Sequence, residues 1–83
     1  RDDINKLIVD KWIEEAEGRK TIFYTSSLEH ALALFAEFEK RGISSGYIDG
    51  RMNIERRREM LRAFKEGKIQ VLTNMNVLTE GFD

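Results

Sequence analysis

Small polar residues follow three short apolar segments of this chain, and their types point to phosphate chemistry. Two of these polar segments, residues 25–27 (Thr-Ser-Ser) and 49–51 (Asp-Gly-Arg), lead directly into stretches with helical spacing, and the third, residues 73–76, reads Thr-Asn-Met-Asn. The start of a helix binds phosphate because its first backbone N–H groups are free and its dipole favours negative charge. The sequence therefore predicts a partner that carries phosphate groups.

Arginines gather around the second polar segment. They are Arg51, Arg56, Arg57 and Arg58. Three glutamates stand near them at helical spacing: Glu55, Glu59 and Glu66. From the residues alone, a salt-bridged and solvated helix face is the favoured interpretation, ahead of a binding site. Arg57 is the exception, because it shares a helix face with Leu61 and Phe64. We expect it to be partly buried, and a half-buried arginine needs a partner.

Ser26 also has a purely structural interpretation. It is followed three residues later by Glu29, which is the spacing of a capping box at the start of a helix. Helix capping is therefore the first interpretation of Ser26 and phosphate contact the second, and one side chain can serve both purposes.

Three helices must position these segments, and each is expected to end at a glycine. The spacing of apolar residues predicts helices over about 3–17, from Ser26 onward and from about Asn53 onward. Glycine adopts the left-handed conformation that closes a helix. The three closing glycines are Gly18, Gly42 and Gly67. The third helix is predicted to bury Ile54, Leu61 and Phe64, with parts of Met60 and Ala63.

Strands are predicted between the helices. Segments 21–25 and 69–73 lack clean alternation, which is typical of strands covered on both faces, whereas 43–48 contains small residues and should lie nearer an edge. Strands that alternate with helices pair in parallel through right-handed crossovers. The expected fold class is therefore α/β, a three-layer α/β/α arrangement with a parallel sheet, the second strand on one side of the first and the third on the other. Ligands of such sheets bind at the carboxyl ends of the strands, where all three polar segments fall.

Composition narrows the classes of function. The chain has 83 residues, a net charge of −1, one histidine and no cysteine, so disulfides are excluded and we expect neither a metal site nor a global attraction to nucleic acid. No apolar run approaches the ~18 residues that a membrane span requires. The sequence has no Walker A loop, no glycine-rich dinucleotide fingerprint and no Ser–His–Asp set, so no catalytic residue is predicted. We expect no membrane partner and a cytoplasmic location.

Three segments in this order resemble the motifs of superfamily 2 helicases. Segment 21–31 (TIFYTSSLEHA) is similar to motif IV. Segment 47–50 (YIDG), followed by Arg57 and Phe64, is similar to the stretch of strand, glycine, arginine and phenylalanine that comes next in the family, and 69–83 (IQVLTNMNVLTEGFD) is similar to motif V. The ending is closest in character to the motor subunits of restriction enzymes and to excision-repair DNA helicases. The resemblance implies that residues 1–83 form a single partial RecA-like (P-loop NTPase) C-terminal domain with a leading helix, truncated before motif VI.

The resemblance also implies roles for individual residues. Those expected near ATP are Glu80, Gly81 and Asp83. Those expected to bind nucleic acid are Thr25, Ser26, Ser27, Gly50, Arg51, Arg57, Asn74 and Asn76. Two positions depart from the pattern of the family. Ile54 replaces a common glutamine, and Met75 stands where RNA helicases of the DEAD-box group carry threonine, which favours DNA over RNA.

The function implied by the resemblance is the second motor lobe of an ATP-dependent DNA helicase or translocase. Its partners would be DNA and the N-terminal RecA-like lobe of the same protein, and its cofactors ATP and Mg²⁺, with Mg²⁺ held by that first lobe. Its location would be cytoplasmic, or the nucleoid or nucleus, wherever that DNA lies. Because motif VI and the first lobe are missing, the chain alone is expected to be inactive. Two alternatives remain: a non-catalytic nucleic-acid-binding α/β module, and a Rossmann-like small-molecule domain, which the missing glycine fingerprint disfavours.

Overall fold

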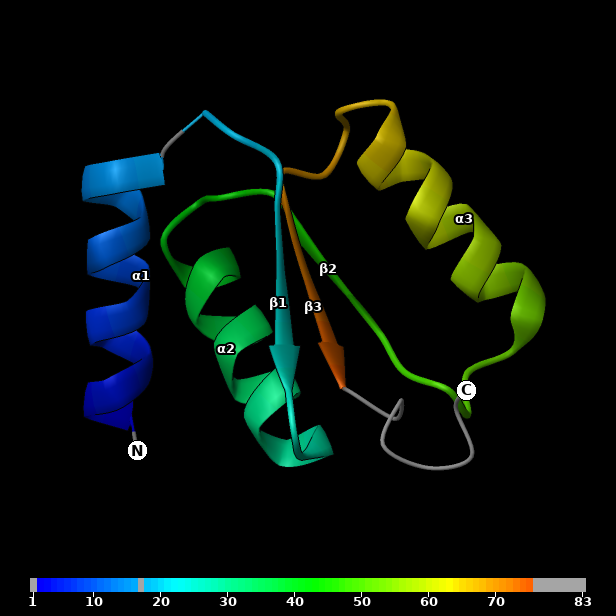
Figure 1. Cartoon of the computed structure of the whole chain (residues 1–83), viewed down its shortest axis with the longest axis horizontal. Coiled ribbons are helices and arrows are strands. Elements are labelled where there is room, and N and C mark those ends of the chain that lie inside the picture. Colours follow the sequence, from blue (N-terminus) through cyan, green and yellow to red (C-terminus); the bar gives the residue numbers. More distant parts are fainter. Residues whose placement is uncertain (1, 17, 76–83) are drawn as a thin grey trace.

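Helices and strands alternate along the chain in the computed structural model, which describes residues 2–16 and 18–75 (Figure 1). In chain order the elements are α1 (Asp2–Ala16), β1 (Thr21–Thr25), α2 (Leu28–Lys40), β2 (Ser45–Ile48), α3 (Ile54–Lys65) and β3 (Val71–Met75). The predicted alternation is confirmed, and the predicted bounds of the first strand are those of β1.

The three strands form a parallel sheet in the order β1-β3-β2. The prediction that the first strand lies in the middle is therefore wrong. The connection from β1 through α2 to β2 passes over β3, and the connection through α3 returns in the opposite direction. Two right-handed crossovers that run in opposite directions must place their helices on opposite faces of the sheet. The central strand is the one whose residues Val71, Leu72 and Thr73 are all buried.

Contacts on the two faces confirm the predicted three-layer α/β/α arrangement. On one face, the hydroxyl of Thr73 donates a hydrogen bond to the carbonyl oxygen of Ala31 in α2 over 3.1 Å. On the other face, a Cβ added at Gly46 of β2 would lie 2.5 Å from Sδ of Met60 in α3. Figure 1 shows α1 and α2 on one side of the strands and α3 on the other. The lack of a side chain at Gly46 thus allows α3 to approach the sheet closely.

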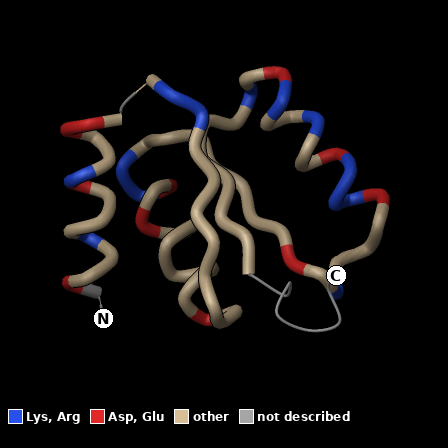
Figure 2. Tube along the Cα trace, in the orientation of Figure 1, with Lys and Arg blue, Asp and Glu red and all other residues tan. Residues whose placement is uncertain are grey.

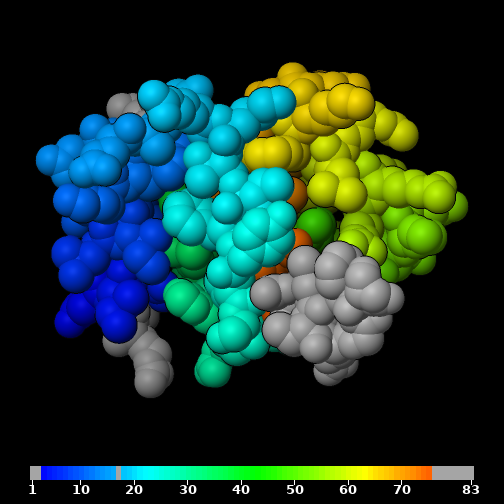
Figure 3. All heavy atoms as spheres, in the orientation of Figure 1, coloured from blue at the N-terminus to red at the C-terminus, as the bar shows by residue number. Residues whose placement is uncertain are grey.

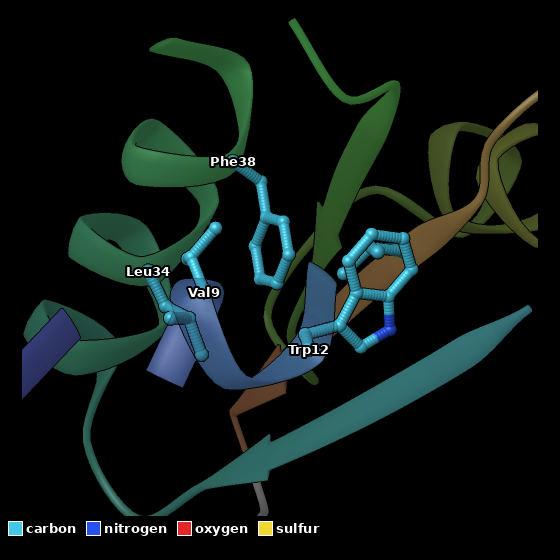
Figure 4. Close-up of a cluster of buried hydrophobic side chains, with 5 residues drawn as sticks. Val9, Trp12, Leu34 and Phe38 are labelled. Atoms are coloured by element: carbon cyan, nitrogen blue, oxygen red, sulfur yellow. The ribbon is translucent and has the colours of Figure 1, made fainter. Parts of the chain in front are cut away.

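The main hydrophobic cluster lies between α1, α2 and the sheet (Figure 4). Its buried members are Val9, Trp12, Leu34, Phe38 and Val71. The rings of Trp12 and Phe38 meet edge to face with centroids 5.5 Å apart, a favoured geometry for aromatic pairs. The leading helix α1 is therefore part of the core of this domain.

Glycines end the helices as predicted. Gly18, Gly42 and Gly67 have φ angles of +92°, +78° and +83°, which is the left-handed region that residues with a Cβ avoid. In each case the chain then turns toward the next strand. The predicted helix ends are therefore confirmed, although Glu17 lies outside the described residues.

The predicted buried face of α3 is wrong for Ile54, Leu61 and Arg57, but the predicted partial burial of Met60 and Ala63 is confirmed. Ile54 and Leu61 are 60% and 41% exposed, Arg57 is exposed, and no described residue of α3 is fully buried. The helix packs on the edge strand β2 through the neighbouring side of its surface, where Met60, Ala63 and Phe64 are half-buried. Because α3 covers one edge of the sheet only, the stripe that contains Arg57 faces solvent.

Candidate nucleic-acid interface

The polar segments that follow the strands lie along one rim of the sheet. Thr25 ends β1, residues 49–51 follow β2, and Asn74 is the last residue but one of β3. The parallel register places Thr25 beside Met75 and Ile48 beside Asn74, so the carboxyl ends of all three strands reach the same edge. In Figure 1 the arrowheads of β1 and β3 point toward this rim, near which α2 and α3 begin. The predicted gathering of Thr25, Arg51 and Asn74 at the carboxyl edge is confirmed.

The segment at the end of β1 holds the start of α2. Ser27, rather than Ser26, is the N-cap, with an extended backbone (φ −138°, ψ 150°) and a hydroxyl that accepts a hydrogen bond from the backbone N–H of His30 over 3.1 Å. The predicted capping box of Ser26 and Glu29 is therefore wrong: the cap lies one residue later, and His30 stands where a capping box has glutamate or glutamine. Thr25 is buried, and its hydroxyl donates to the carbonyl oxygen of Ser27 over 2.9 Å. Ser26 and Ser27 are both exposed at the rim, and Ser26 is the one whose hydroxyl caps no helix.

The segment at the end of β2 is organised by Asp49. Its carboxylate accepts hydrogen bonds from the hydroxyl of Tyr47 through Oδ2 and from the backbone N–H of Arg51 through Oδ1, the latter over 2.7 Å. The Tyr47 hydrogen bond, followed by backbone donors, holds the pKa of Asp49 below its ordinary value, although burial opposes this. Burial, and then the hydrogen bond to Asp49, raise the pKa of Tyr47 to about 12.

The start of α3 faces an open depression at this rim. Asn53 is the N-cap of α3, and its Oδ1 accepts from the backbone N–H groups of Glu55 at 2.8 Å and Arg56 at 3.3 Å. The predicted start of the third helix is thereby confirmed. The residues that line the depression are Tyr47, Asp49, Arg51, Met52, Asn53 and Arg56. Two guanidinium groups and the positive end of a helix dipole therefore border one surface, which is an arrangement suited to anions.

The cations of α3 lie on an exposed surface. Basic residues recur along the whole helix in Figure 2. Arg56, Arg57, Arg58 and Arg62 are all exposed, and the ion pairs found among residues 2–16 and 18–75 involve none of them. The predicted solvated face is present, but the salt bridges expected within it do not form among the described residues. Because no described acidic side chain pairs with these guanidinium groups, they are available to a negatively charged partner.

The sequence groups Arg56 with Arg51, but it does not single out Tyr47 or Asn53 as members of the same site. A signal for them exists in the spacing of the chain. Tyr47 and Asp49 are two residues apart at the end of a strand, so their side chains project to the same face. Asn53 and Arg56 are three residues apart at the start of a helix, where the side chains of such a pair are neighbours.

Several predicted site residues lie outside the described residues. They are Asn76, Glu80, Gly81 and Asp83. The predicted contacts to ATP therefore stay predictions.

Within residues 2–16 and 18–75, no three histidine, aspartate or glutamate side chains come together in a way that could hold a metal ion. In the same part of the chain, every helix is too short or too polar to cross a bilayer.

Comparison with known proteins finds relatives that match most of the chain. A putative mitochondrial ATP-dependent helicase irc3 from Schizosaccharomyces pombe is 36% identical over 73 residues, which is 87% of this chain and 12% of that protein. The UvrABC system protein B of Acaryochloris marina is 37% identical over 73 residues, or 86% of this chain and 11% of that protein. A 51.5 kDa protein of a Lactococcus phage (isolate 7-9) is 32% identical over 76 residues, covering 92% of this chain and 17% of that protein.

The chain thus spans less than a fifth of the length of each of these relatives. The match to a family is more extensive. The family model described as the helicase conserved C-terminal domain matches residues 2–83, and the described part has the α/β layers and parallel sheet expected from the resemblance. On this evidence the chain belongs to the family of helicase conserved C-terminal domains.

Proposed function

We propose that this domain is the second motor lobe of an ATP-dependent DNA helicase or translocase, and that its carboxyl rim binds the phosphate backbone of the DNA. The observation that carries the proposal is the placement of Arg51 and Arg56 around the depression at the start of α3. Both side chains are exposed and neither is in an ion pair with a described acidic residue. Contacts to phosphate give affinity without sequence preference, as movement along a strand requires.

The rest of the rim supports the same partner. Ser26 presents an exposed hydroxyl beside the capped start of α2, and Asn74 lies at the end of the central strand between the two helix starts. Gly50 is exposed at the tip of the turn that leads to Arg51. A strand that runs along this edge would meet Ser26, Asn74 and the 50–51 turn in succession. Arg57, on the outer face of α3, would add a cation beside this path.

DNA is the proposed substrate, and Met75 at the end of β3 is the residue that favours it over RNA, by the resemblance described above. ATP would contact the segment that contains Glu80, Gly81 and Asp83, and Mg²⁺ would be held by carboxylates of the N-terminal RecA-like lobe. Nucleotide binding and hydrolysis would supply the energy that closes and opens the two lobes. The protein would act in the compartment that holds its DNA.

Salt-dependent DNA binding by the full-length protein tests the phosphate contacts. We expect Arg51→Ala and Arg56→Ala each to weaken binding of a fluorescent oligo(dT), and to reduce the slope of log affinity against log salt by about 0.7 per lost contact to a single strand. Arg19→Ala is the matched control, because Arg19 is also exposed but lies before β1, at the opposite edge of the sheet. Binding by both rim variants that equals that of Arg19→Ala would rule out the proposed interface.

DNA-stimulated ATP hydrolysis by the full-length protein separates a motor from a non-catalytic binding module. A motor lobe couples the two ligands, so addition of DNA should increase the rate of hydrolysis. A folded full-length protein that binds DNA with the expected salt dependence, but hydrolyses no ATP, would be a binding module.

A further inference from the structure

Among residues 3–16 and 18–75, Asp49 is the one Asp, Glu, His, Lys or Arg side chain that is buried, with 8% of its surface exposed. Burial of a carboxylate is unfavourable unless hydrogen bonds or an opposite charge compensate for the lost hydration. No described lysine or arginine forms an ion pair with Asp49. Compensation comes instead from the hydroxyl of Tyr47 and the backbone N–H of Arg51.

These two hydrogen bonds join the strand to the turn that follows it. Tyr47 lies two residues before Asp49, inside β2, and Arg51 lies two residues after it. A third bond, from the backbone N–H of Met52 to the carbonyl oxygen of Asp49 over 3.3 Å, closes the same turn. The carboxylate therefore fixes the direction in which the chain leaves the sheet before it reaches the start of α3.

The consequence for Arg51 is that its backbone is held while its side chain is not. The two donors occupy both oxygens of Asp49, and the guanidinium of Arg51 remains exposed on the depression that Asn53 and Arg56 also line. Arg51 lies close enough to contribute to the lowered pKa of Asp49, but makes no ion pair with it. A carboxylate that captured this guanidinium would compete with phosphate, and the observed hydrogen bonds avoid that competition.

We propose that Asp49 is a positioning residue: it holds the turn at residues 50–51 so that the guanidinium of Arg51 faces the depression beside Arg56, where the pair binds backbone phosphate. This proposal rests on the proposed function, and it assigns a role to a residue that need not touch the nucleic acid. Asp49 acts on binding through Arg51, so its effect must vanish when the Arg51 guanidinium is removed.

The experiment measures the affinity of the full-length protein for a fluorescent oligo(dT) over a range of salt concentrations. Asp49→Ala should weaken binding about tenfold, because the Arg51 guanidinium then loses its hydrogen bond to a charged phosphate. Arg51→Ala should weaken binding by the same factor. Asp49→Asn retains an oxygen that accepts from the N–H of Arg51, so it should bind within about twofold of the wild type. In the Arg51→Ala background, Asp49→Ala should cause no further loss, because the two residues contribute through one contact.

A second variant keeps the test valid if Asp49→Ala does not fold. The double substitution Tyr47→Phe with Asp49→Leu removes the hydroxyl and the carboxylate together, so no buried polar group of this pair loses its partner while the shapes stay similar. It should fold, as judged by an unchanged cooperative melt, and should weaken binding as much as Arg51→Ala does.

The outcomes separate failure of the positioning role from failure of the proposed function. If Arg51→Ala weakens binding and both Asp49 variants that lack the acceptor bind like the wild type, Asp49 does not position Arg51, although the interface stands. If Asp49→Ala weakens binding by the same factor with and without Arg51, it acts through overall stability and the positioning role is wrong. If Arg51→Ala itself leaves affinity and salt dependence unchanged, the proposed function fails at this site.

Discussion

The indole Nε1 of Trp12 donates a hydrogen bond to the hydroxyl of Thr21 over 2.9 Å, and this bond joins the leading helix α1 to the first residue of β1. The same hydroxyl donates to the carbonyl oxygen of Arg19 over 3.0 Å, so the turn between the two elements is held as well. Trp12 is 5% exposed and packs on Phe38 of α2. The Trp12 side chain therefore connects α1 both to β1 and to α2.

Truncation of this side chain should destabilise the domain strongly. Trp12→Ala removes a large buried aromatic group and leaves Thr21 without its donor, so we expect the free energy of unfolding to fall by about 3–5 kcal/mol. Leu7→Ala is the control on the same helix, because Leu7 is 65% exposed, and it should change the value by less than about 0.5 kcal/mol. Urea denaturation followed by circular dichroism measures both. Similar losses for the two variants would show that α1 does not pack in this orientation.

The cap of α2 gives a prediction that distinguishes two neighbouring serines. Ser27→Ala removes the acceptor of the His30 N–H and should lower the free energy of unfolding by about 1 kcal/mol. Ser26→Ala, at an exposed position that caps nothing, should have an effect below about 0.5 kcal/mol. Denaturation curves of the two variants provide the measurement. The reverse order would support the capping box expected from Ser26 and Glu29.

Local signals in the sequence predicted most of the elements, because each signal acts within a few residues. The glycines that end the helices and Asn53 at the start of α3 are examples, since a left-handed φ or a side-chain acceptor is required at one position only. The cap of α2 shows the limit of this reasoning. Ser26 and Ser27 are chemically equivalent, and the choice between them depends on where β1 ends.

The order of the strands could not be predicted from local signals. Segment 21–25 is as apolar as the central strand, yet Ile22 and Tyr24 are 36% and 59% exposed in β1. Figure 3 shows β1 at the surface beside α3. Phe23 packs on Phe38 of α2, so Ile22 and Tyr24 point to the other face of the sheet, where α3 packs mainly on β2. Which strand is covered depends on the path of the crossovers, and composition does not encode that path.

The orientation of α3 was mispredicted for a related reason, and it changes what is expected of two arginines. The sequence places Arg57 beside Leu61 and Phe64, which suggested a buried face and a larger loss of stability for Arg57→Ala than for Arg58→Ala. Because both arginines are exposed, we now expect the two variants to melt within about 0.5 kcal/mol of each other and of the wild type. A distinctly larger loss of stability for Arg57→Ala, measured by thermal melting, would show that Arg57 lies on the buried face of α3, as the sequence predicts.

The buried carboxylate of Asp49 should make the stability of the domain depend on pH. Its pKa is lowered in the folded chain, chiefly by the hydroxyl of Tyr47. A lowered folded pKa means that the charged form stabilises the fold. This contribution is complete above the unfolded pKa of about 3.9, and it is lost as the pH falls through the lower folded value. The melting temperature of the wild type should therefore fall more steeply below about pH 4 than that of Asp49→Asn, which has no charge to lose at this position.

Tyr47→Phe tests the cause of that pH dependence. It removes the donor with the largest effect on the pKa of Asp49 and leaves the backbone N–H of Arg51 in place. The folded pKa of Asp49 should then move back toward its ordinary value, so the acid-dependent loss of stability should lie between those of the wild type and Asp49→Asn. Parallel acid melting curves for all three proteins would mean that other carboxylates dominate acid unfolding. In that case the hydrogen bond from Tyr47 to Asp49 would not stabilise the charged form enough to matter for the fold.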